Sequence, residues 1–190
     1  MKRLATIVLS LMVLGLSGCV KELAPFDHQK QLEIDKQKIE KYVNDNQLPM
    51  MMHENSGIYY MIITEPINEG GLGNYIYRFT DATKTYVETP IVTIKYKGKL
   101  LDGTVFDENT TGLRYNLAGL IKAWQMIVLP SAIDGITIGG ITQNGLQAGY
   151  KVRFITPSYW AYQNNAQGTI PANSPLEFEI EVVKIEPPVQ

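Results

Sequence analysis

The segment IVTIKYKGKLLDGTVFD, residues 91–107, decides how the rest of this chain of 190 residues can fold. Apolar residues and one glycine occupy every second position from Val92 to Leu100, and threonine and lysine take the alternate positions. This period of two is typical of a strand with one face in the core and the other in solvent. Asp102-Gly103 then favours a tight hairpin turn. The segment therefore predicts two antiparallel strands, with Phe106-Asp107 at the start of the second.

The hairpin segment resembles the signature of the FKBP-type peptidyl-prolyl cis-trans isomerases. It carries the pattern Tyr96-x-Gly98-x-Leu100-x-Asp102-Gly103-x-x-Phe106-Asp107, and further blocks follow in the family's order: Leu120-Ile121-x-x-Trp124, Ala161-Tyr162, Gly168-Thr169-Ile170-Pro171 and Leu176 to Val182. The resemblance covers about Gly57 to Ile185. It implies an α+β fold, in which a twisted antiparallel sheet of five to six strands wraps around one short helix, with a short N-terminal helical extension.

Residues 1–18 resemble a bacterial lipoprotein signal peptide. A basic start precedes the apolar stretch Leu4 to Leu16, which is too short to span a bilayer as a helix. Leu16-Ser17-Gly18-Cys19 then resembles a lipobox, so we expect lipidation of Cys19, the sole cysteine of the chain. An ordinary secretory signal with a chance cysteine is the alternative. A single cysteine also implies that no disulfide stabilises the chain.

Two or more acyl chains on Cys19 would anchor the mature protein to a membrane without spanning it. Val20 follows, with no aspartate to indicate retention in the inner membrane. We therefore expect a place in the bacterial cell envelope, at the outer membrane facing the periplasm. Lys21-Glu22 hints only weakly at surface export.

The expected domains are a lipid-anchored tether with a short helix over 19–56 and an isomerase domain over 57–190. The polar, helix-prone extension is too short for the dimerising arm of some family members, which favours a spacer. The methionines at 50–52 indicate loose packing, with a copper site as the alternative. The glycine- and isoleucine-rich stretch at about 130–144 predicts an inserted loop or small hairpin, with a substrate-contacting flap as the alternative.

Further elements follow from alternation and turn residues. We expect an extra hairpin before residue 91, with Tyr75, Tyr77 and Phe79 alternating along one arm, and a polar loop over 108–112. A helix is predicted at Leu120 to Leu129. The resemblance places the last strand, Leu176 to Ile185, beside the signature strand. Lysines 95, 97 and 99 would then face glutamates 177, 179 and 181 on a solvated face, each pair contributing a fraction of a kcal/mol.

Several kinds of chemistry are excluded. The net charge of −2 and the lack of a basic stripe argue against nucleic acid as a partner. His28 and His53 are the only histidines and lie outside the signature region, so we expect no metal site, cofactor, catalytic triad or histidine acid-base chemistry.

Prolyl isomerisation needs none of these groups, because it breaks no σ bond. Its barrier of about 18–20 kcal/mol arises from lost amide resonance as the C–N bond twists. The planar amide has a polar, hydrated carbonyl, whereas the twisted amide is more ketone-like and loses less on dehydration. An apolar aromatic cleft therefore favours the twisted state.

The resemblance assigns the site residue by residue. The catalytic set is Tyr96, Phe106, Asp107, Ile121, Trp124 and Tyr162, and the substrate-binding set is Leu113, Tyr115, Leu120, Ile170 and Phe178. Trp124 would lie under the proline ring, and the Ile121 N–H and the Tyr162 hydroxyl would hold substrate carbonyls. Asp107 would fix the local polarity and orient Tyr96 or the peptide. The alternatives are plain core aromatics and a turn-capping aspartate.

Three positions depart from the family pattern. Ala123 replaces a glycine before the tryptophan, Gln163 replaces a glycine after the tyrosine, and Leu113 or Tyr115 stands where an aromatic wall is expected. The resemblance implies an envelope prolyl isomerase acting on proline-containing polypeptides, with FKBP-binding macrolides as further ligands. The alternative is an FKBP-like binding module, a chaperone or scaffold with weak or no catalysis.

Overall fold

The computed structural model describes residues 26–66 and 74–188, so the predicted signal segment 1–18 and Cys19 lie outside the described residues. In chain order the elements are α1 (His28–Asp45), β1 (Met51–His53), β2 (Ile58–Thr64), β3 (Ile91–Leu100), β4 (Val105–Asn116), the 3-10 helix η1 (Leu117–Gly119), α2 (Lys122–Val128), β5 (Ala132–Ile133), β6 (Ile136–Thr137), β7 (Lys151–Thr156), the 3-10 helix η2 (Ser158–Trp160) and β8 (Leu176–Glu186).

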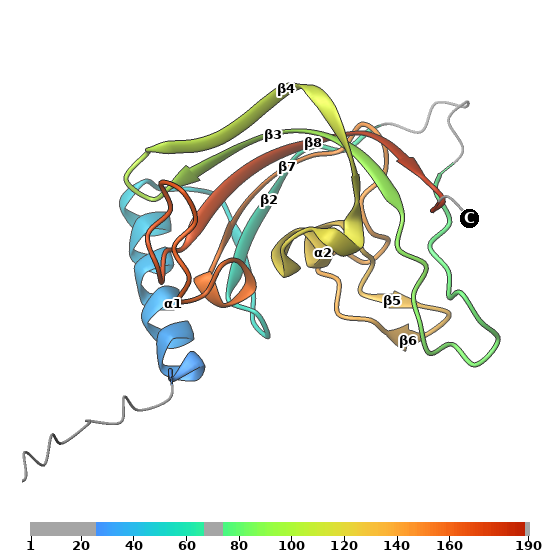
Figure 1. Ribbon diagram of the computed structural model, residues 1–190, viewed down its shortest axis with the longest axis horizontal. Helices are drawn as coiled ribbons and strands as arrows, with labels where there is room; N and C mark the ends of the chain where they lie inside the picture. Colours follow the sequence, from blue (N-terminus) through green and yellow to red (C-terminus); the bar gives the residue numbers. More distant parts are fainter. Residues whose placement is uncertain (1–25, 67–73, 189–190) are drawn as a thin grey trace, which may run out of the picture.

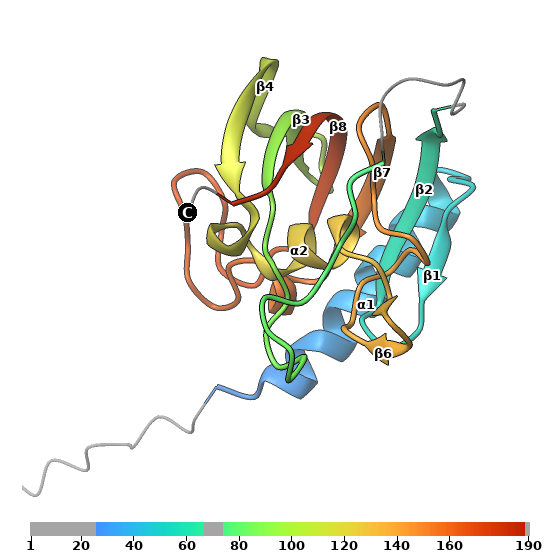
Figure 2. The ribbon, with the colours of Figure 1, turned by 90° about the vertical axis from the view of Figure 1, so that its right-hand side faces the viewer.

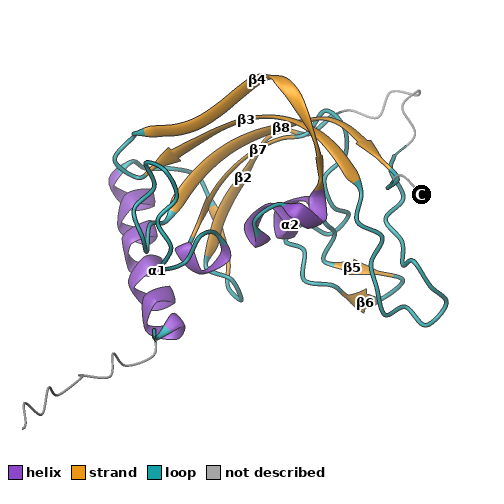
Figure 3. Ribbon diagram, in the orientation of Figure 1, coloured by secondary structure: helices purple, strands orange, loops and turns teal. Residues whose placement is uncertain are grey.

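Six antiparallel strands form one sheet in the order β1-β2-β7-β8-β3-β4, and β5 pairs separately with β6. The large sheet arches over α2, and α1 lies at one end of the sheet (Figures 1 and 3). This arrangement confirms the predicted α+β fold, with six strands around one short helix. The predicted signature hairpin is β3 and β4, and Gly103 takes the expected positive φ of 91° in its turn.

The core lies between the concave face of the sheet and α2. Fully buried side chains from the sheet are Ile58, Val92, Ile94, Val152, Phe154, Leu176, Ile180 and Val182, and those from α2 are Ala123, Ile127 and Val128. No side chain caps the N-terminus of α2, which is only seven residues long. Because so short a helix is marginal by itself, its burial under the sheet stabilises it.

The prediction of a polar loop over 108–112 was wrong, because β4 is one continuous strand. Its pairing with β3 shifts register between Asn109 and Leu113, so residues 110–112 bulge from the ladder. Gly112 has a φ of 94°, and its N–H donates to Asn109 Oδ1 at 2.7 Å. The bulge, rather than a loop, therefore accounts for the polar residues in this segment.

Helix α1 is part of the packed structure and not a free spacer. Asp27 caps it by accepting from the N–H of Lys30 at 3.0 Å. Its buried residues include Leu32, Ile39 and Val43, and the last two pack with Ile155 on the outer face of β7. The helix thus covers one end of the outer face. Among the helices that the structure describes, none is long and apolar enough to cross a membrane.

The long connection before β3 contains the expected extra hairpin, reduced to one bridge between Phe79 and Val87. Tyr75 and Phe79 are half-buried and Tyr77 is buried, as the predicted alternation requires. Residues 67–73 of this connection lie outside the described residues.

The predicted insertion forms the small hairpin β5–β6, and it packs with the connection before β3 (Figure 2). The Tyr77 hydroxyl donates to the backbone carbonyls of Val128 and Leu146 at 2.9 and 2.6 Å. Lys84 also pairs with Asp134 at 2.9 Å. The two segments that lengthen this chain therefore form one unit at the C-terminal end of α2.

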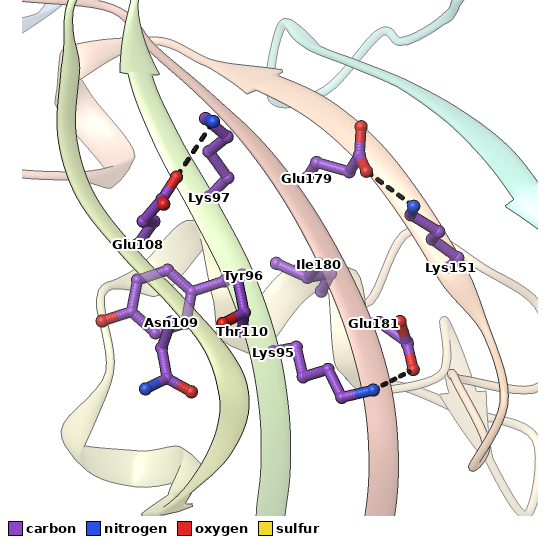
Figure 4. Close-up of a pocket in the computed structure, with 10 residues that line it drawn as sticks. All are labelled: Lys95, Tyr96, Lys97, Glu108, Asn109, Thr110, Lys151, Glu179, Ile180 and Glu181. Carbon is purple, nitrogen blue, oxygen red and sulfur yellow. Dashed lines mark hydrogen bonds and ion pairs between the residues drawn. The ribbon is translucent and has the colours of Figure 1, made fainter.

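The outer face of the sheet carries the predicted ladder of opposite charges. Lys95, Lys97 and Lys99 lie opposite Glu181, Glu179 and Glu177, which confirms the register. Two of these three form ion pairs: Lys95 binds Glu181 at 2.9 Å and Lys99 binds Glu177 at 2.8 Å. The middle pair does not, because Lys97 binds Glu108 of β4 at 2.9 Å. Glu179 binds Lys151 of β7 at 2.8 Å instead (Figure 4).

Glu177 corrects the expectation of a solvated face. Its side chain is only 1% exposed, because α1 covers this end of the sheet. It accepts from Lys99 at 2.8 Å, Arg153 Nε at 2.9 Å and the Tyr42 hydroxyl at 2.9 Å. The charge expected at the surface is therefore the centre of a buried cluster that joins α1 to three strands.

Candidate functional site

A cleft of about 260 Å³ opens between β3, β4 and the N-terminal end of α2. Its lining is Tyr96, Phe106, Asp107, Tyr115, Gly119, Leu120, Ile121, Trp124, Tyr162 and Phe178. All of the residues assigned to the catalytic set line it, as do Tyr115, Leu120 and Phe178 from the substrate-binding set. The fold thus gathers side chains from the signature hairpin, the helix, the last strand and the loop after η2.

Aromatic rings build the base and walls of the cleft. Trp124 is only 5% exposed and meets Tyr96 and Phe178 edge to face, with ring centroids 5.4 and 5.5 Å apart. Phe178 meets Phe106 in the same way at 5.6 Å. These distances and angles lie in the range that aromatic pairs prefer. Each ring is therefore held by its neighbours, and the cleft is preformed.

Tyr96 and Asp107 form the polar side of the cleft. The Tyr96 hydroxyl donates to Asp107 Oδ2 at 2.7 Å, and the Tyr115 hydroxyl donates to the Tyr96 oxygen at 3.4 Å. Burial raises the pKa of Tyr96, and its hydrogen bonds with Tyr115 and Asp107 raise it further. The phenol therefore keeps its proton at neutral pH and donates it in the hydrogen bond to the Asp107 carboxylate.

Two hydrogen-bond donors at the cleft have no protein acceptor among the described residues. One is the backbone N–H of Ile121, the residue that caps α2, and the other is the hydroxyl of Tyr162. Burial raises the pKa of Tyr162, and the negative charge of Asp107 raises it further, so this phenol also stays protonated. Both groups are available to donate to carbonyl oxygens of a bound molecule.

Two predicted substrate-binding residues lie outside the lining. Leu113, at the edge of the bulge in β4, is 43% exposed, whereas Ile170 is buried in the core. The sequence left open whether Leu113 or Tyr115 takes the place of the aromatic wall residue, and Tyr115 is the one that lines the cleft. Gly119 lines the cleft and was missed, because a residue without a side chain gives no chemical signal in the sequence.

The other departures are both accommodated. Ala123 is fully buried in the core beside Trp124. Gln163 takes a φ of 55°, in the left-handed region that favours glycine. Its backbone N–H donates to the carbonyl of Ser158 at 2.8 Å and its side chain donates to the carbonyl of Tyr159 at 3.3 Å. The loop that carries Tyr162 thus keeps a turn suited to glycine without having one.

Gly98→Ala should distort the cleft wall. A Cβ at this position would lie 2.5 Å from two ring carbons of Phe106 and 3.1 Å from Phe178. The half-buried Phe106 ring must move, and overpacking of this kind costs about 1–3 kcal/mol. Urea unfolding should show that loss, and the ring signals of Phe106 should shift in NMR spectra. The control is Gly119→Ala, whose new methyl group meets no atom within 4 Å; equal losses in both variants would contradict the steric argument.

A second hollow, of about 440 Å³, lies on the outer face over β3, β4, β7 and β8 (Figure 4). Its charged side chains are taken up in the ion pairs described above, which leaves no single-sign charge to attract a ligand. In the part of the chain that the structure describes, no group of three or more His, Cys, Asp or Glu residues could hold a metal ion. The aromatic cleft is therefore the stronger candidate site.

Comparison with known proteins agrees with this geometry. The family model for FKBP-type peptidyl-prolyl cis-trans isomerases matches residues 83–183. The FKBP-type peptidyl-prolyl cis-trans isomerase FkpA of Aeromonas hydrophila is 33% identical over 100 residues, which are 53% of this chain and 33% of that protein. A peptidyl-prolyl cis-trans isomerase of Saccharomyces cerevisiae is 32% identical over 99 residues, 50% of this chain and 20% of that protein. The chain thus spans a third or less of the length of these curated relatives.

Two solved structures share the fold. The crystal structure of FkpA from Escherichia coli superposes with a TM-score of 0.54 and 23% identity, over 84% of this chain and 63% of that one. A peptidyl-prolyl cis-trans isomerase of Pseudomonas syringae pv. tomato gives a TM-score of 0.50 and 23% identity, over 85% and 97% of the two chains. Because the family model matches more than half of its length, this chain belongs to the family of FKBP-type peptidyl-prolyl cis-trans isomerases.

Proposed function

We propose that this protein is a peptidyl-prolyl cis-trans isomerase that twists X–Pro bonds in the aromatic cleft. The observation that carries the proposal is the combination of a preformed apolar base at Trp124 with two unpaired donors, the Ile121 N–H and the Tyr162 hydroxyl. The base suits a proline ring, and the donors suit the carbonyls on either side of it. The substrates would be proline-containing polypeptides.

Desolvation is the main source of catalysis in this proposal. The X–Pro carbonyl loses hydration when it enters a cleft lined by Tyr96, Phe106 and Phe178. The planar amide depends more on that hydration than the twisted amide, so its removal lowers the barrier to rotation. The two donors would fix the flanking peptide, so that rotation occurs about one bond only.

Asp107 contributes an oriented negative charge beside the twisting bond. Its carboxylate is fixed by the Tyr96 hydroxyl at 2.7 Å and lies at the cleft lining. As the C–N bond loses double-bond character, nitrogen donates less electron density to the carbonyl carbon, which becomes more electrophilic, as in a ketone. The fixed carboxylate would lie beside this carbon. FKBP-binding macrolides would compete with peptides for the same apolar base.

We also propose that the protein acts in the bacterial cell envelope, lipid-anchored through Cys19 at the outer membrane and facing the periplasm. The support is the sequence of residues 1–19, with its basic start, apolar stretch and lipobox. Clients would then be exported or envelope proteins. Metabolic labelling with an alkyne-bearing fatty acid should mark the wild-type protein, and Cys19→Ser should abolish the label.

The isomerase proposal is tested by two-dimensional NMR exchange on an Ala-Leu-Pro-Phe peptide with protein that begins at Val20. The wild type should accelerate cis-trans exchange, which takes about tens to hundreds of seconds without a catalyst. Tyr162→Phe, which removes one hydroxyl, should lower kcat/KM by about three- to tenfold, the equivalent of one hydrogen bond. Exchange at the uncatalysed rate in folded wild type, with the peptide still bound, would instead favour a binding module.

A further inference from the structure

Ser158 closes the turn that carries Tyr162. The carbonyl of Ser158 accepts from the N–H groups of Ala161 and Gln163 at 2.9 and 2.8 Å. These bonds close the turn on both sides of Tyr162, and the second one fixes Gln163 in its left-handed conformation. The position of Ser158 therefore helps to set where the Tyr162 hydroxyl lies.

Ser158 is in turn bound by a buried carboxylate from outside the sheet. Asp35 of α1 is fully buried, and its Oδ2 accepts from the Ser158 N–H at 2.8 Å and from the Ser158 hydroxyl at 2.5 Å. Its other oxygen accepts from the Gln31 side chain at 2.7 Å. Lys38 is the nearest cation, with its Nζ 3.8 Å from Oδ1. A buried charge is costly unless hydrogen bonds satisfy it, so Asp35 binds Ser158 tightly.

Helix α1 itself is fixed against the domain, so Asp35 is a rigid point of attachment. Ile39 and Val43 pack with Ile155 of β7, and the Tyr42 hydroxyl donates to Glu177 of β8 at 2.9 Å. α1 therefore connects the sheet to η2 independently of the loop itself. It lies outside residues 83–183, the part matched by the family model.

We propose that Asp35 is a positioning residue for Tyr162, so that α1 is a working part of the isomerase site. The inference rests on the proposed function. Asp35 touches no group in the cleft; it acts through Ser158 and the turn that Ser158 closes. Loss of its negative charge would weaken both hydrogen bonds to Ser158 and let the Tyr162 hydroxyl move relative to the Ile121 N–H.

A double-mutant cycle in the full mature chain separates positioning from general stability. Asp35→Asn keeps the shape of the side chain but removes its negative charge, so the hydrogen bonds from the Ser158 N–H and hydroxyl are no longer charge-assisted. It should lower kcat/KM by about fivefold or more, since misplacement of a group by about an ångström costs up to about 100-fold. In a Tyr162→Phe background the same change should cause no further loss, because no hydroxyl is left to position. Equal losses in both backgrounds, or no loss in folded Asp35→Asn, would overturn the proposal.

The control is Asp45→Asn, a change of the same chemistry near the C-terminal end of α1. Asp45 is 58% exposed and, among the described residues, pairs only with Lys41, at 2.6 Å, so kcat/KM should stay at the wild-type value. If Asp35→Asn does not fold, Ser158→Ala replaces it, because this variant removes only the hydroxyl donor. Ser158→Ala should lower kcat/KM when Tyr162 is present and cause no further loss in the Tyr162→Phe background. Equal losses in both backgrounds would overturn the proposal.

A readout that needs no activity keeps the two proposals apart. Amide hydrogen exchange of Gln163 should accelerate by about tenfold in Asp35→Asn, and the Tyr162 ring signals should shift, while Asp45→Asn leaves both unchanged. If the wild type has no isomerase activity, the proposed function fails and these signals still test the coupling. Unchanged exchange and ring signals would contradict a role for Asp35 in placing Tyr162.

Discussion

Trp124→Ala is expected to lower kcat/KM for X–Pro isomerisation by about 10- to 100-fold. Trp124 forms the base of the cleft, and burying one apolar group contributes about 1.5–3 kcal/mol, which corresponds to that range. Because the ring also packs edge to face with Tyr96 and Phe178, its removal takes one aromatic neighbour from each of them. The free energy of unfolding should therefore fall by about 3–5 kcal/mol as well. Peptide exchange by NMR and urea unfolding measure the two effects.

Ile127→Ala separates the loss of activity from the loss of stability. Ile127 lies on the same helix, is fully buried and does not line the cleft. Its truncation should cost about 2–5 kcal/mol in unfolding free energy. The kcat/KM of the folded protein should nevertheless stay close to that of the wild type. A similar fall in kcat/KM for both variants would mean that Trp124 acts through stability alone and would remove it from the proposed site.

The parts of the fold that follow local rules could be predicted from the sequence. Alternation from Val92 to Leu100 and the turn at Asp102-Gly103 predicted the β3–β4 hairpin, since a period of two and a turn residue with positive φ are local properties. The register of β8 against β3 also followed, because it came with the family resemblance. Most of the cleft lining followed for the same reason, but Gly119 was missed and the predicted Leu113 and Ile170 lie outside the lining.

Contacts between distant segments could not be predicted. The polar residues 108–112 look like a loop, because only the pairing with β3 shows that a bulge absorbs them. Asp35 and Glu177 look like surface charges, because Asp35 lies in a polar, helix-prone stretch and Glu177 lies in an alternating strand. They are buried because α1 packs on η2 and on the outer face of the sheet, and no local pattern encodes that contact.

The connection before β3 and the insertion after α2 also show that contacts between distant segments escape prediction. The sequence predicted a hairpin in each, but the hydrogen bonds from Tyr77 to the carbonyls of Val128 and Leu146 depend on their meeting in space. Since Val128 is the last residue of α2, the connection before β3 helps to fix the C-terminal end of the helix whose N-terminal end carries Ile121. Elements outside the family's core pattern thus support both ends of the site.

Glu177→Ala is expected to lower the free energy of unfolding by about 3–5 kcal/mol, the typical result of removing one partner from a buried charge cluster. The change would leave Lys99, Arg153 and the Tyr42 hydroxyl without their shared acceptor. Urea unfolding at pH 7 measures the loss. Glu179→Ala is the control on the same strand, because Glu179 is 41% exposed and its pair with Lys151 contributes about 0–1 kcal/mol. Equal losses would contradict the burial of Glu177.

The effect of Glu177 should also depend on pH. Burial alone raises the pKa of Glu177, but hydrogen bonds from Arg153, Lys99 and Tyr42 outweigh it, and the net pKa lies below the ordinary value of 4.5. A depressed carboxyl pKa contributes stability above the unfolded pKa, and this contribution is lost as the pH falls through the folded pKa. The difference in unfolding free energy between wild type and Glu177→Gln should therefore be constant near neutral pH and shrink below pH 4.5. A difference that stays constant into acid would show that packing, rather than the charge of Glu177, holds α1 on the sheet.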